Sequence, residues 1–356
     1  MTIPRFDLRT MLDAVQEIKA PSTFFMSLLF PPASRQTFDT ESVDFDYVAA
    51  RRRLAPFSNI NLPGTIIGRD GYTMQTVTPP NIAPVIPITG ADLQTRAPGR
   101  HVYNPQDPSA RADELLGEDL SKLKVMITRT IEWMIASVLQ DETITLFGAG
   151  VGAPITFPRA AAHQRARLAG ADRWDVGTSD PLGDIRSWSE AIRQSTGLYG
   201  DTLVLGQGAG DALLRNPVLA PMLDRRRLDL GLLAPEIIES GVTYLGRLAG
   251  TLVEIYQYTE WFEDPTTGVE GPLLDTPLGD ESVAVMFSSK APTKLCYGAV
   301  PVAQGEGDEA YITLVRGEMV PVSWTESDPA RRFLKLQARP LPVLQMNNAV
   351  YVRDVL

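Results

Sequence analysis

Cysteine and histidine are scarce in this sequence. Its 356 residues include one cysteine, Cys296, and two histidines, His101 and His163. A single cysteine cannot form an intrachain disulfide, which favours a reducing compartment. Zinc sites need several cysteine, histidine or carboxylate ligands, and triad-type catalysis needs a histidine beside its nucleophile. We therefore expect no metal site, no cofactor and no histidine-based catalytic centre.

The sequence also lacks long apolar runs, and its basic residues are outnumbered by acidic ones. The most apolar early stretch, residues 24–30, is far shorter than the ~20 residues that cross a bilayer. Lysine and arginine number 33 against 43 aspartates and glutamates, which gives a net charge of −10. That balance argues against non-specific nucleic-acid binding, because such binding depends on neutralising phosphates. We expect a folded protein without membrane contact that can lie beside DNA without adhering to it.

One long helix is predicted over residues 108–140. Pro108 suits a first helical position, and Asp107 before it can cap the exposed amides. Apolar residues then recur in steps of three and four along one face. They are Leu116, Leu120, Leu123, Ile127, Ile131, Met134 and Val138. At 1.5 Å per residue the helix would be roughly 50 Å long, well beyond the ordinary length. We expect its apolar face to be covered by strands at residues 331–354 and after Thr143.

A short amphipathic piece near residues 9–19 and an apolar segment, PSTFFMSLLFPPAS, precede the helix. Phe24, Phe25 and Phe30 are too apolar to remain in water, and the prolines around them prevent a long helix. Two interpretations stay open, namely an arm that packs on a neighbouring subunit and an arm that packs on its own core. We take these three residues as candidate intersubunit contacts.

Residues 46–100 have the pattern of a projecting loop. SVDFDYV alternates apolar and acidic residues as a half-buried strand does. Further on, GRDGY predicts a tight turn at Gly68, Asp70 and Gly71 between two extended runs. Connections of this length are uncommon in compact domains and are usually functional. We expect an extended two-stranded loop.

After the long helix the pattern becomes mixed. Short strands are expected at 143–147 and 155–157, and residues 159–177 have no clean period and suggest a loop. An α/β region then begins with a helix near 181–195, a strand at TLVLG and a helix near 211–223. Residues 241–262 have the composition of a β-hairpin, and the last thirty residues predict two strands around Asn347-Asn348.

The glycine-rich stretch LVLGQGAGDALL, residues 203–214, offers an enzyme-like alternative. A strand, Gly206, Gly208 and Gly210, and a helix resemble a dinucleotide fingerprint. Asp211 occupies the place of the third glycine, however, and an acidic helix start would repel a pyrophosphate. A nucleotide-binding α/β enzyme that uses this turn is therefore the weaker hypothesis.

Two arginine triples stand out in so acidic a chain. No surrounding basic patch supports nucleic-acid contact, so we interpret both as candidate intersubunit contacts with carboxylates, with helix-end charge compensation as the alternative. They are Arg51, Arg52, Arg53, Arg225, Arg226 and Arg227.

The order of these parts resembles the tailed-phage major capsid proteins, specifically the lambda-type major capsid protein E family. WTESDPARRFLKLQARPLPVL at 324–344 is similar to the family's "DPA-R" element and the strand after it. Residues 241–262 resemble its central hairpin, and WDVGTSDPLGDIRSW at 174–188 resembles the entry to its apical lobe. The similarity is collinear over nearly the whole chain.

This resemblance implies an α+β fold of the Hong Kong 97 type. The implied divisions are an N-terminal arm (1–45), an extended β-loop (46–100), the spine helix with the first part of a peripheral domain (101–179), an axial domain (180–322) and peripheral closing strands (323–356). The implied function is that of a non-enzymatic major capsid protein of a tailed double-stranded DNA bacteriophage or prophage. The alternative is an encapsulin-like or other non-viral shell protein, which would also assemble from many copies of one chain.

The resemblance also implies partners and a location. Copies of the chain would form hexamers and pentamers of an icosahedral virion shell after synthesis in the host bacterial cytoplasm. That shell would enclose DNA without sequence-specific binding. A portal and a cement protein are expected partners. The scaffolding protein is expected to be a separate chain, because no long charged helix precedes the arm. The lysines are Lys19, Lys122, Lys124, Lys290, Lys294 and Lys335. None lies in 46–100, so we expect no isopeptide cross-link through a loop lysine, as some proteins of this fold form.

Overall fold

The computed structural model describes most of the chain apart from its first 22 residues and several internal stretches. The described residues are 23–48, 54–55, 57, 67, 72–94, 108–147, 153–216, 223–224, 236–239, 241–248, 251–264, 267–275, 281–304 and 311–356.

The long helix, α4, spans Pro108–Asp141, as the sequence predicts. Its 34 residues give it a length of about 50 Å. From Leu120 to Val138 every predicted stripe residue is at most 2% exposed, and Leu116 is partly buried. Ile135 and Leu139 are buried as well, because α4 is covered from more than one side. The elements that contact it include β20 (Ala330–Gln337), β21 (Pro340–Leu344), β22 (Val350–Asp354), β5 (Thr143–Ile144) and the short helix α2 (Phe24–Leu29). These contacts confirm the predicted covering by the closing strands and by the strand after Thr143.

The C-terminal end of α4 is closed by a buried arginine. The Arg159 guanidinium donates to the carbonyl oxygens of Leu139, at 2.8 Å, and Val138. A positive group at this end is also stabilising, because the C-terminal end of the helix dipole is negative. Burial lowers the pKa of Arg159 to about 10, which leaves it charged at neutral pH.

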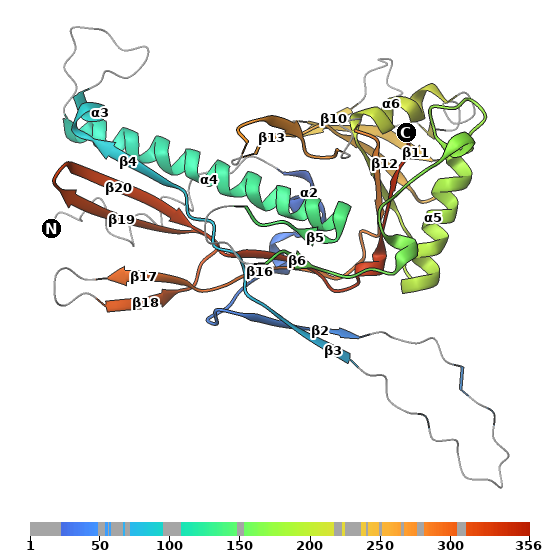
Figure 1. Ribbon diagram of the computed structural model, residues 1–356, viewed down its shortest axis with the longest axis horizontal. Helices are drawn as coiled ribbons and strands as arrows, with labels where there is room; N and C mark the ends of the chain where they lie inside the picture. Colours follow the sequence, from blue (N-terminus) through green and yellow to red (C-terminus); the bar gives the residue numbers. More distant parts are fainter. Residues whose placement is uncertain are drawn as a thin grey trace.

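A sheet of β19 (Val320–Ser327), β20 (Ala330–Gln337) and β4 (Val85–Thr89) runs beside α4, with β20 in the centre (Figure 1). β4 is followed directly by α3 (Gly90–Gln94). Residues 85–94 therefore belong with the spine helix, although the sequence places them in the extended loop.

The second large layer is an eight-stranded sheet on the other side of the molecule, covered by α5 and α6 (Figure 1). Along the sheet its strands are β10 (Glu236–Glu239), β11 (Val242–Leu248), β12 (Glu254–Tyr258), β8 (Thr202–Leu205), β15 (Val283–Phe287), β22 (Val350–Asp354) and β7 (Ala166–Arg167), with β9 (Leu223–Asp224) paired to β11. α5 spans Pro181–Thr196, close to the prediction; Asp180 caps its start and Gly197 ends it at a φ of 87°.

Strand pairing divides the chain differently from the predicted boundaries. β22 lies in the eight-stranded sheet beside β15, so one strand of the predicted closing segment 323–356 joins that sheet. Conversely, β16 (Thr293–Tyr297) pairs with β21 (Pro340–Leu344) and with β1 (Arg35–Thr37). β16 therefore pairs with a strand of the predicted closing segment, although it lies before the expected boundary at 322. The cause is non-local pairing, which local sequence patterns do not encode.

Short elements complete the described fold. They are α2 (Phe24–Leu29), the 3-10 helices η1 (Pro32–Ser34), η2 (Ala161–His163), η3 (Gly170–Asp172) and η6 (Asn347–Ala349), and the pairs β5 (Thr143–Ile144) with β6 (Ile155–Thr156) and β13 (Trp261–Glu263) with β14 (Glu270–Pro272). Residues 159–177, predicted as a loop, contain short elements fixed by Trp174, which is 2% exposed. Its backbone N–H donates to Val355 and its indole N–H to Asp184.

Candidate assembly surfaces

Two hairpins project from the body of the molecule (Figure 1). The first is the ribbon formed by β2 (Val43–Val48) and β3 (Tyr72–Val77). β3 falls within the predicted extended loop, and β2 begins just before it. The second, formed by β17 (Val300–Gln304) and β18 (Tyr311–Val315), belongs to a separate two-stranded sheet. We call them the ribbon and the hairpin.

The ribbon carries apolar side chains in solvent. Met74 on β3 is 63% exposed, and beyond β2 the side chains of Leu54 and Phe57 are 94% and 104% exposed. Nearer the body, Val43 is buried and Phe45 stacks on Phe157 with ring centroids 6.1 Å apart. The ribbon is therefore anchored at its base and exposes apolar groups away from it. The predicted turn at Gly68, Asp70 and Gly71 lies outside the described residues.

The hairpin has one covered and one uncovered apolar face. Val300 and Val302 are at most 4% exposed and pack with Val320 in a small core of their own. On the opposite face, Ile312 is 78% exposed and Leu314 is 58% exposed. Their cross-strand partners, Ala303 and Pro301, are exposed too. The sequence analysis did not single out this hairpin. The signal was present in AVPVAQ and YITLV, two alternating runs on either side of the glycine-containing GEGDEA.

The roots of both projections meet at one buried arginine. Arg339, 7% exposed, donates to Ala299 O at 2.9 Å, immediately before β17. It also donates to Pro79 O at 3.4 Å, shortly after β3, and lies 3.7 Å from the Glu41 carboxylate, shortly before β2. The junction is closely packed, because a Cβ on Gly298 would lie 3.3 Å from the Pro79 side chain. The guanidinium therefore joins the ribbon and the hairpin to the body at a single point.

The phenylalanines of the N-terminal arm lie in the subunit's own core. Phe24 is 6% exposed, and Phe25 and Phe30 are fully buried. The rings of Phe24 and Phe25 pack against the ring of Tyr258 on β12, with centroid separations of 5.5 and 5.2 Å. This placement matches the second of the two interpretations of the arm. An intersubunit contact through these three side chains would require the segment to leave the core.

A buried carboxylate holds this segment in place. Glu132 on α4 is 2% exposed and accepts hydrogen bonds from Phe25 N at 2.7 Å and Met26 N at 3.0 Å. The Tyr258 hydroxyl donates to it at 3.0 Å. Burial, partly offset by these donors, raises the pKa of Glu132 to about 7. Glu132 is a residue that sequence reasoning missed. It is the only charged residue between Arg129 and Asp141, and a lone acid in an apolar stretch of helix is the signal that could have found it.

The arginine triples cannot be placed against these surfaces. Arg51–Arg53 and Arg225–Arg227 all lie outside the described residues, and their predicted intersubunit pairing stays a prediction.

The glycine-rich stretch is explained by close packing. Gly206 caps α6 (Gln207–Arg215), which begins four residues before the predicted start and also ends earlier. A Cβ on Gly206 would lie 2.4 Å from the carbonyl oxygen of Glu281, which accepts a hydrogen bond from Ala209 N. A Cβ on Gly210 would lie 2.9 Å from the Gln257 side chain. The chain's own backbone therefore covers the helix start where a dinucleotide phosphate would have to sit.

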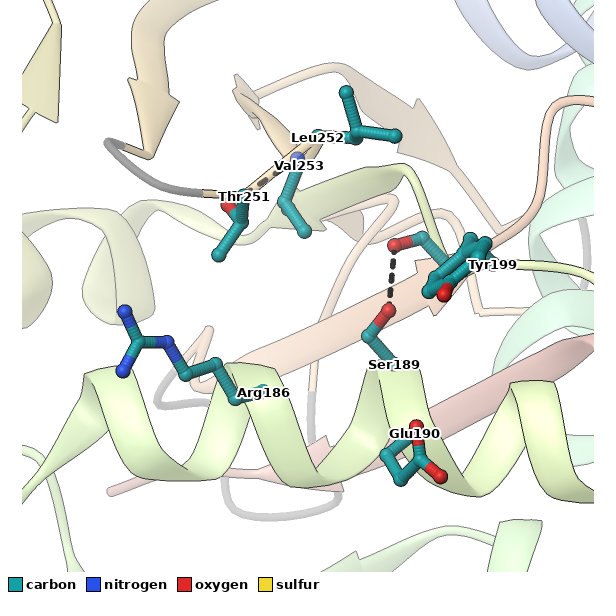
Figure 2. Close-up of a pocket in the computed structure, with 8 residues that line it drawn as sticks. Arg186, Ser189, Glu190, Tyr199, Thr251, Leu252 and Val253 are labelled. Atoms are coloured by element: carbon teal, nitrogen blue, oxygen red, sulfur yellow. Dashed lines mark hydrogen bonds between the residues drawn. The ribbon is translucent and has the colours of Figure 1, made fainter.

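A depression of about 500 Å³ lies between α5 and residues 251–253 (Figure 2). The polar side chains that line it are engaged within the chain. Ser189 donates to Gly200 O at 3.0 Å, Thr251 donates to Leu248 O at 3.0 Å, and the Glu190 carboxylate binds Arg193 at 2.6 Å. None of the lining residues pairs a nucleophile with an adjacent base.

The described part of the chain contains no group of three or more histidine, cysteine, aspartate or glutamate side chains placed to hold a metal ion. None of its helices combines the length and hydrophobicity that crossing a membrane requires.

Comparisons with known proteins agree with this architecture. The family described as phage major capsid protein E matches residues 7–352. A prophage capsid protein from E. coli CFT073 is 15% identical, with a TM-score of 0.69 over 99% of both chains. A phage-related protein from Bordetella bronchiseptica RB50 is 14% identical, with a TM-score of 0.53 over 99% of this chain and 98% of that one. The mature capsid of bacteriophage PhiM1 is 8% identical, with a TM-score of 0.50 over 94% and 88%. No curated protein matches the sequence. The fold is thus the α+β, Hong Kong 97-type capsid fold.

Proposed function

Because the chain belongs to the phage major capsid protein E family, we propose that its copies associate into hexamers and pentamers through the ribbon and the hairpin. The protein is the major capsid protein of a tailed phage or prophage, and its place is the virion shell. What remains to be assigned is the part of the subunit that forms the contacts.

The observation that supports this assignment is apolar surface gathered on elements that leave the body. Leu54, Phe57, Ile312 and Leu314 are between 58% and 104% exposed. Fully burying one such side chain contributes about 1.5–3 kcal/mol, part of which offsets the cost of association. Because ribbon and hairpin are different surfaces, each subunit can contact different neighbours with each, as ring and shell closure requires.

The test is assembly of the full-length chain. Purified protein examined by negative-stain microscopy should show rings or irregular assemblies, and Phe57→Ser combined with Ile312→Ser should yield monomers with an unchanged circular dichroism spectrum. The matched control is Tyr199→Ser, an exposed aromatic (57%) in the depression of Figure 2. If the double variant assembles as the parent does, these surfaces are not the contacts.

The remaining partners are inferred from the family to which the chain belongs. We propose a separate scaffolding protein, a portal and a cement protein, with DNA enclosed but not bound by sequence, and no catalytic activity. The net charge of −10 supports loose contact with packaged DNA, because like charges repel. Uniform closed shells from this chain expressed alone would contradict the need for a scaffold.

The arginine triples complete the proposal. Arg51–Arg53 and Arg225–Arg227 would pair with carboxylates of neighbouring subunits, a role suited to the fixed charge of arginine. Residues 46–100 contain no lysine, so we also expect denaturing gels of mature particles to show single subunits. Ladders of covalently linked subunits would contradict this expectation.

A further inference from the structure

A groove of about 430 Å³ lies along one face of α4. Phe147, from the segment after β5, and Phe262, from β13, form one of its walls. The Trp133 ring lies 4.8 Å from that of Phe147 and 6.4 Å from that of Phe262, so the groove is built around a row of aromatic rings. Four residues line it from the helix at spacings of three and four, which places them on one face. They are Met126, Arg129, Thr130 and Trp133.

Charge is confined to two residues of the groove, Arg129 and Glu263. The other lining side chains are apolar apart from Thr130. Two of them are well exposed, Met126 at 52% and Phe147 at 38%, because no described element covers them. The groove therefore suits an apolar and uncharged occupant.

The uncovered face of the hairpin has the matching chemistry. Ile312 and Leu314 are two residues apart on β18, so their side chains point the same way at a separation of about 7 Å. Their cross-strand partners, Ala303 and Pro301, are small and uncharged. The two large side chains therefore form a ridge, which we call the β18 ridge. A two-stranded hairpin is marginally stable by itself, so covering this ridge would also stabilise the hairpin.

The base of the hairpin and the groove lie on opposite sides of α4. Burial lowers the pKa of Lys124 on α4, and the Glu318 carboxylate, shortly after β18, partly offsets this shift because it lies nearby. The hairpin thus joins the body on the side of α4 that carries Lys124. Met126 is two residues further along, and such residues are separated by about 200° around a helix axis. Figure 1 likewise shows β13 and the hairpin on opposite sides of α4. The groove of another copy is therefore the one that the β18 ridge can enter.

We propose that the β18 ridge of one subunit packs into the α4 groove of a neighbouring copy, with Ile312 and Leu314 against the rings of Trp133 and Phe147. This inference rests on the proposed function and names the surface that receives the hairpin. Because the ridge and the groove are different surfaces of one chain, the contact is head-to-tail, and repetition of such a contact closes a ring.

The small size of the groove favours a second copy over an unrelated partner. Stable complexes of two proteins bury about 1,200–2,000 Å², far more than two aliphatic side chains in this groove can supply. A free partner with no other contact would therefore dissociate readily. A copy that is also held through the ribbon meets the groove at a high effective concentration, so a small contact suffices.

The test is a cross-link between two full-length variants that each carry one new thiol. Ala303→Cys places a thiol beside the β18 ridge and Thr130→Cys places one in the groove, and both leave the apolar side chains intact. After co-expression, a short bifunctional maleimide should join the two variants into a covalent dimer on denaturing gels. Native Cys296 should not interfere, because it is 3% exposed and burial raises its thiol pKa to about 11. Peptide mass spectrometry identifies the linked pair.

A positional control separates this contact from random collision. Leu252→Cys replaces Thr130→Cys as the partner of Ala303→Cys. Leu252 is 60% exposed but lies in the depression of Figure 2, so we expect no link.

A second control examines the groove itself. Phe147→Ser, added to the Thr130→Cys variant, should lower the yield of the linked pair about tenfold or more, because the ridge loses an apolar partner. Tyr199→Ser, an exposed aromatic outside the groove, should leave the yield unchanged. Circular dichroism verifies that each variant is folded.

The outcomes distinguish this inference from the proposed function. Assemblies in negative-stain images, with equal yields for the groove and Leu252 pairs, would show that the ridge contacts another surface. The inference would then be wrong while the proposed function stands. A yield unaffected by Phe147→Ser would likewise show that the groove is not the contact. Neither assemblies nor links would contradict the proposed function, and the inference with it.

Discussion

The apolar segment at residues 24–30 and strand β18 of the hairpin both carry large apolar side chains, yet these side chains lie in opposite environments. Phe25 and Phe30 are fully buried, whereas Ile312 and Leu314 are more than half exposed. The difference is a polar anchor. Glu132 on α4 accepts hydrogen bonds from the backbone N–H groups of Phe25 and Met26 and so fixes the segment against α4 and β12. The outward face of the hairpin has no such covering element among the described residues. Hydrophobicity alone therefore does not identify the surface that awaits a neighbour.

The largest effect should come from truncating the buried segment. Phe25→Ala should lower the free energy of unfolding by about 3–5 kcal/mol, because it leaves a cavity in a close-packed core. Phe57→Ala, the same substitution at a fully exposed position, should change it by less than about 0.5 kcal/mol. Urea unfolding of the two variants measures both values. Similar losses in the two would contradict the contrast between buried and exposed segments.

A smaller loss of unfolding free energy should follow when the anchoring carboxyl group of Glu132 is replaced. Glu132→Gln keeps the shape but replaces a carboxyl oxygen, which can accept a hydrogen bond in either protonation state, by an NH2 group that only donates and faces a backbone N–H. We expect a loss of about 1–3 kcal/mol at pH 5. Glu118→Gln, at an exposed position of the same helix, is the matched control and should be neutral.

The same anchor should make stability depend on pH. Its folded pKa, about 7, lies above the ordinary value of 4.5, so the folded state keeps a proton that the unfolded state loses between these pH values. The Glu132 contribution is complete below pH 4.5, falls as pH rises towards 7, and is constant above. The difference in unfolding free energy between the parent protein and Glu132→Gln should therefore become smaller from pH 5 to pH 8. Parallel profiles would show that Glu132 is already ionised in the fold.

The smallest effect on stability, with a large effect on assembly, is expected at the hairpin. Ile312→Ser with Leu314→Ser should change the unfolding free energy by less than about 0.5 kcal/mol, yet abolish particles in negative-stain images. Val302→Ser, on the covered face of the same hairpin, should lower the melting temperature instead, because its side chain is 4% exposed.

Much of the fold is predictable from local patterns. The bounds of α4 and α5 and the strand pairs at 143–156 and 241–258 follow from periodicity and capping. The placement of β22, β16 and β4 does not, because sheet partners distant in sequence decide it. For the same reason, nothing near Phe25 indicates that Glu132, more than a hundred residues away, will bind its amide. The family resemblance supplied the overall function, but not which apolar surface remains open.

Arg339 makes the two projections mechanically dependent on each other. The ribbon and the hairpin share one guanidinium as a common fastening, through Pro79 O, Ala299 O and the Glu41 carboxylate. A change in the angle of one projection must stretch bonds that also hold the other. In the proposed five-fold and six-fold rings, subunits would sit at different tilts. A tilt of the ribbon at one contact would then also change the angle of the hairpin at the next contact, because both are fastened to Arg339.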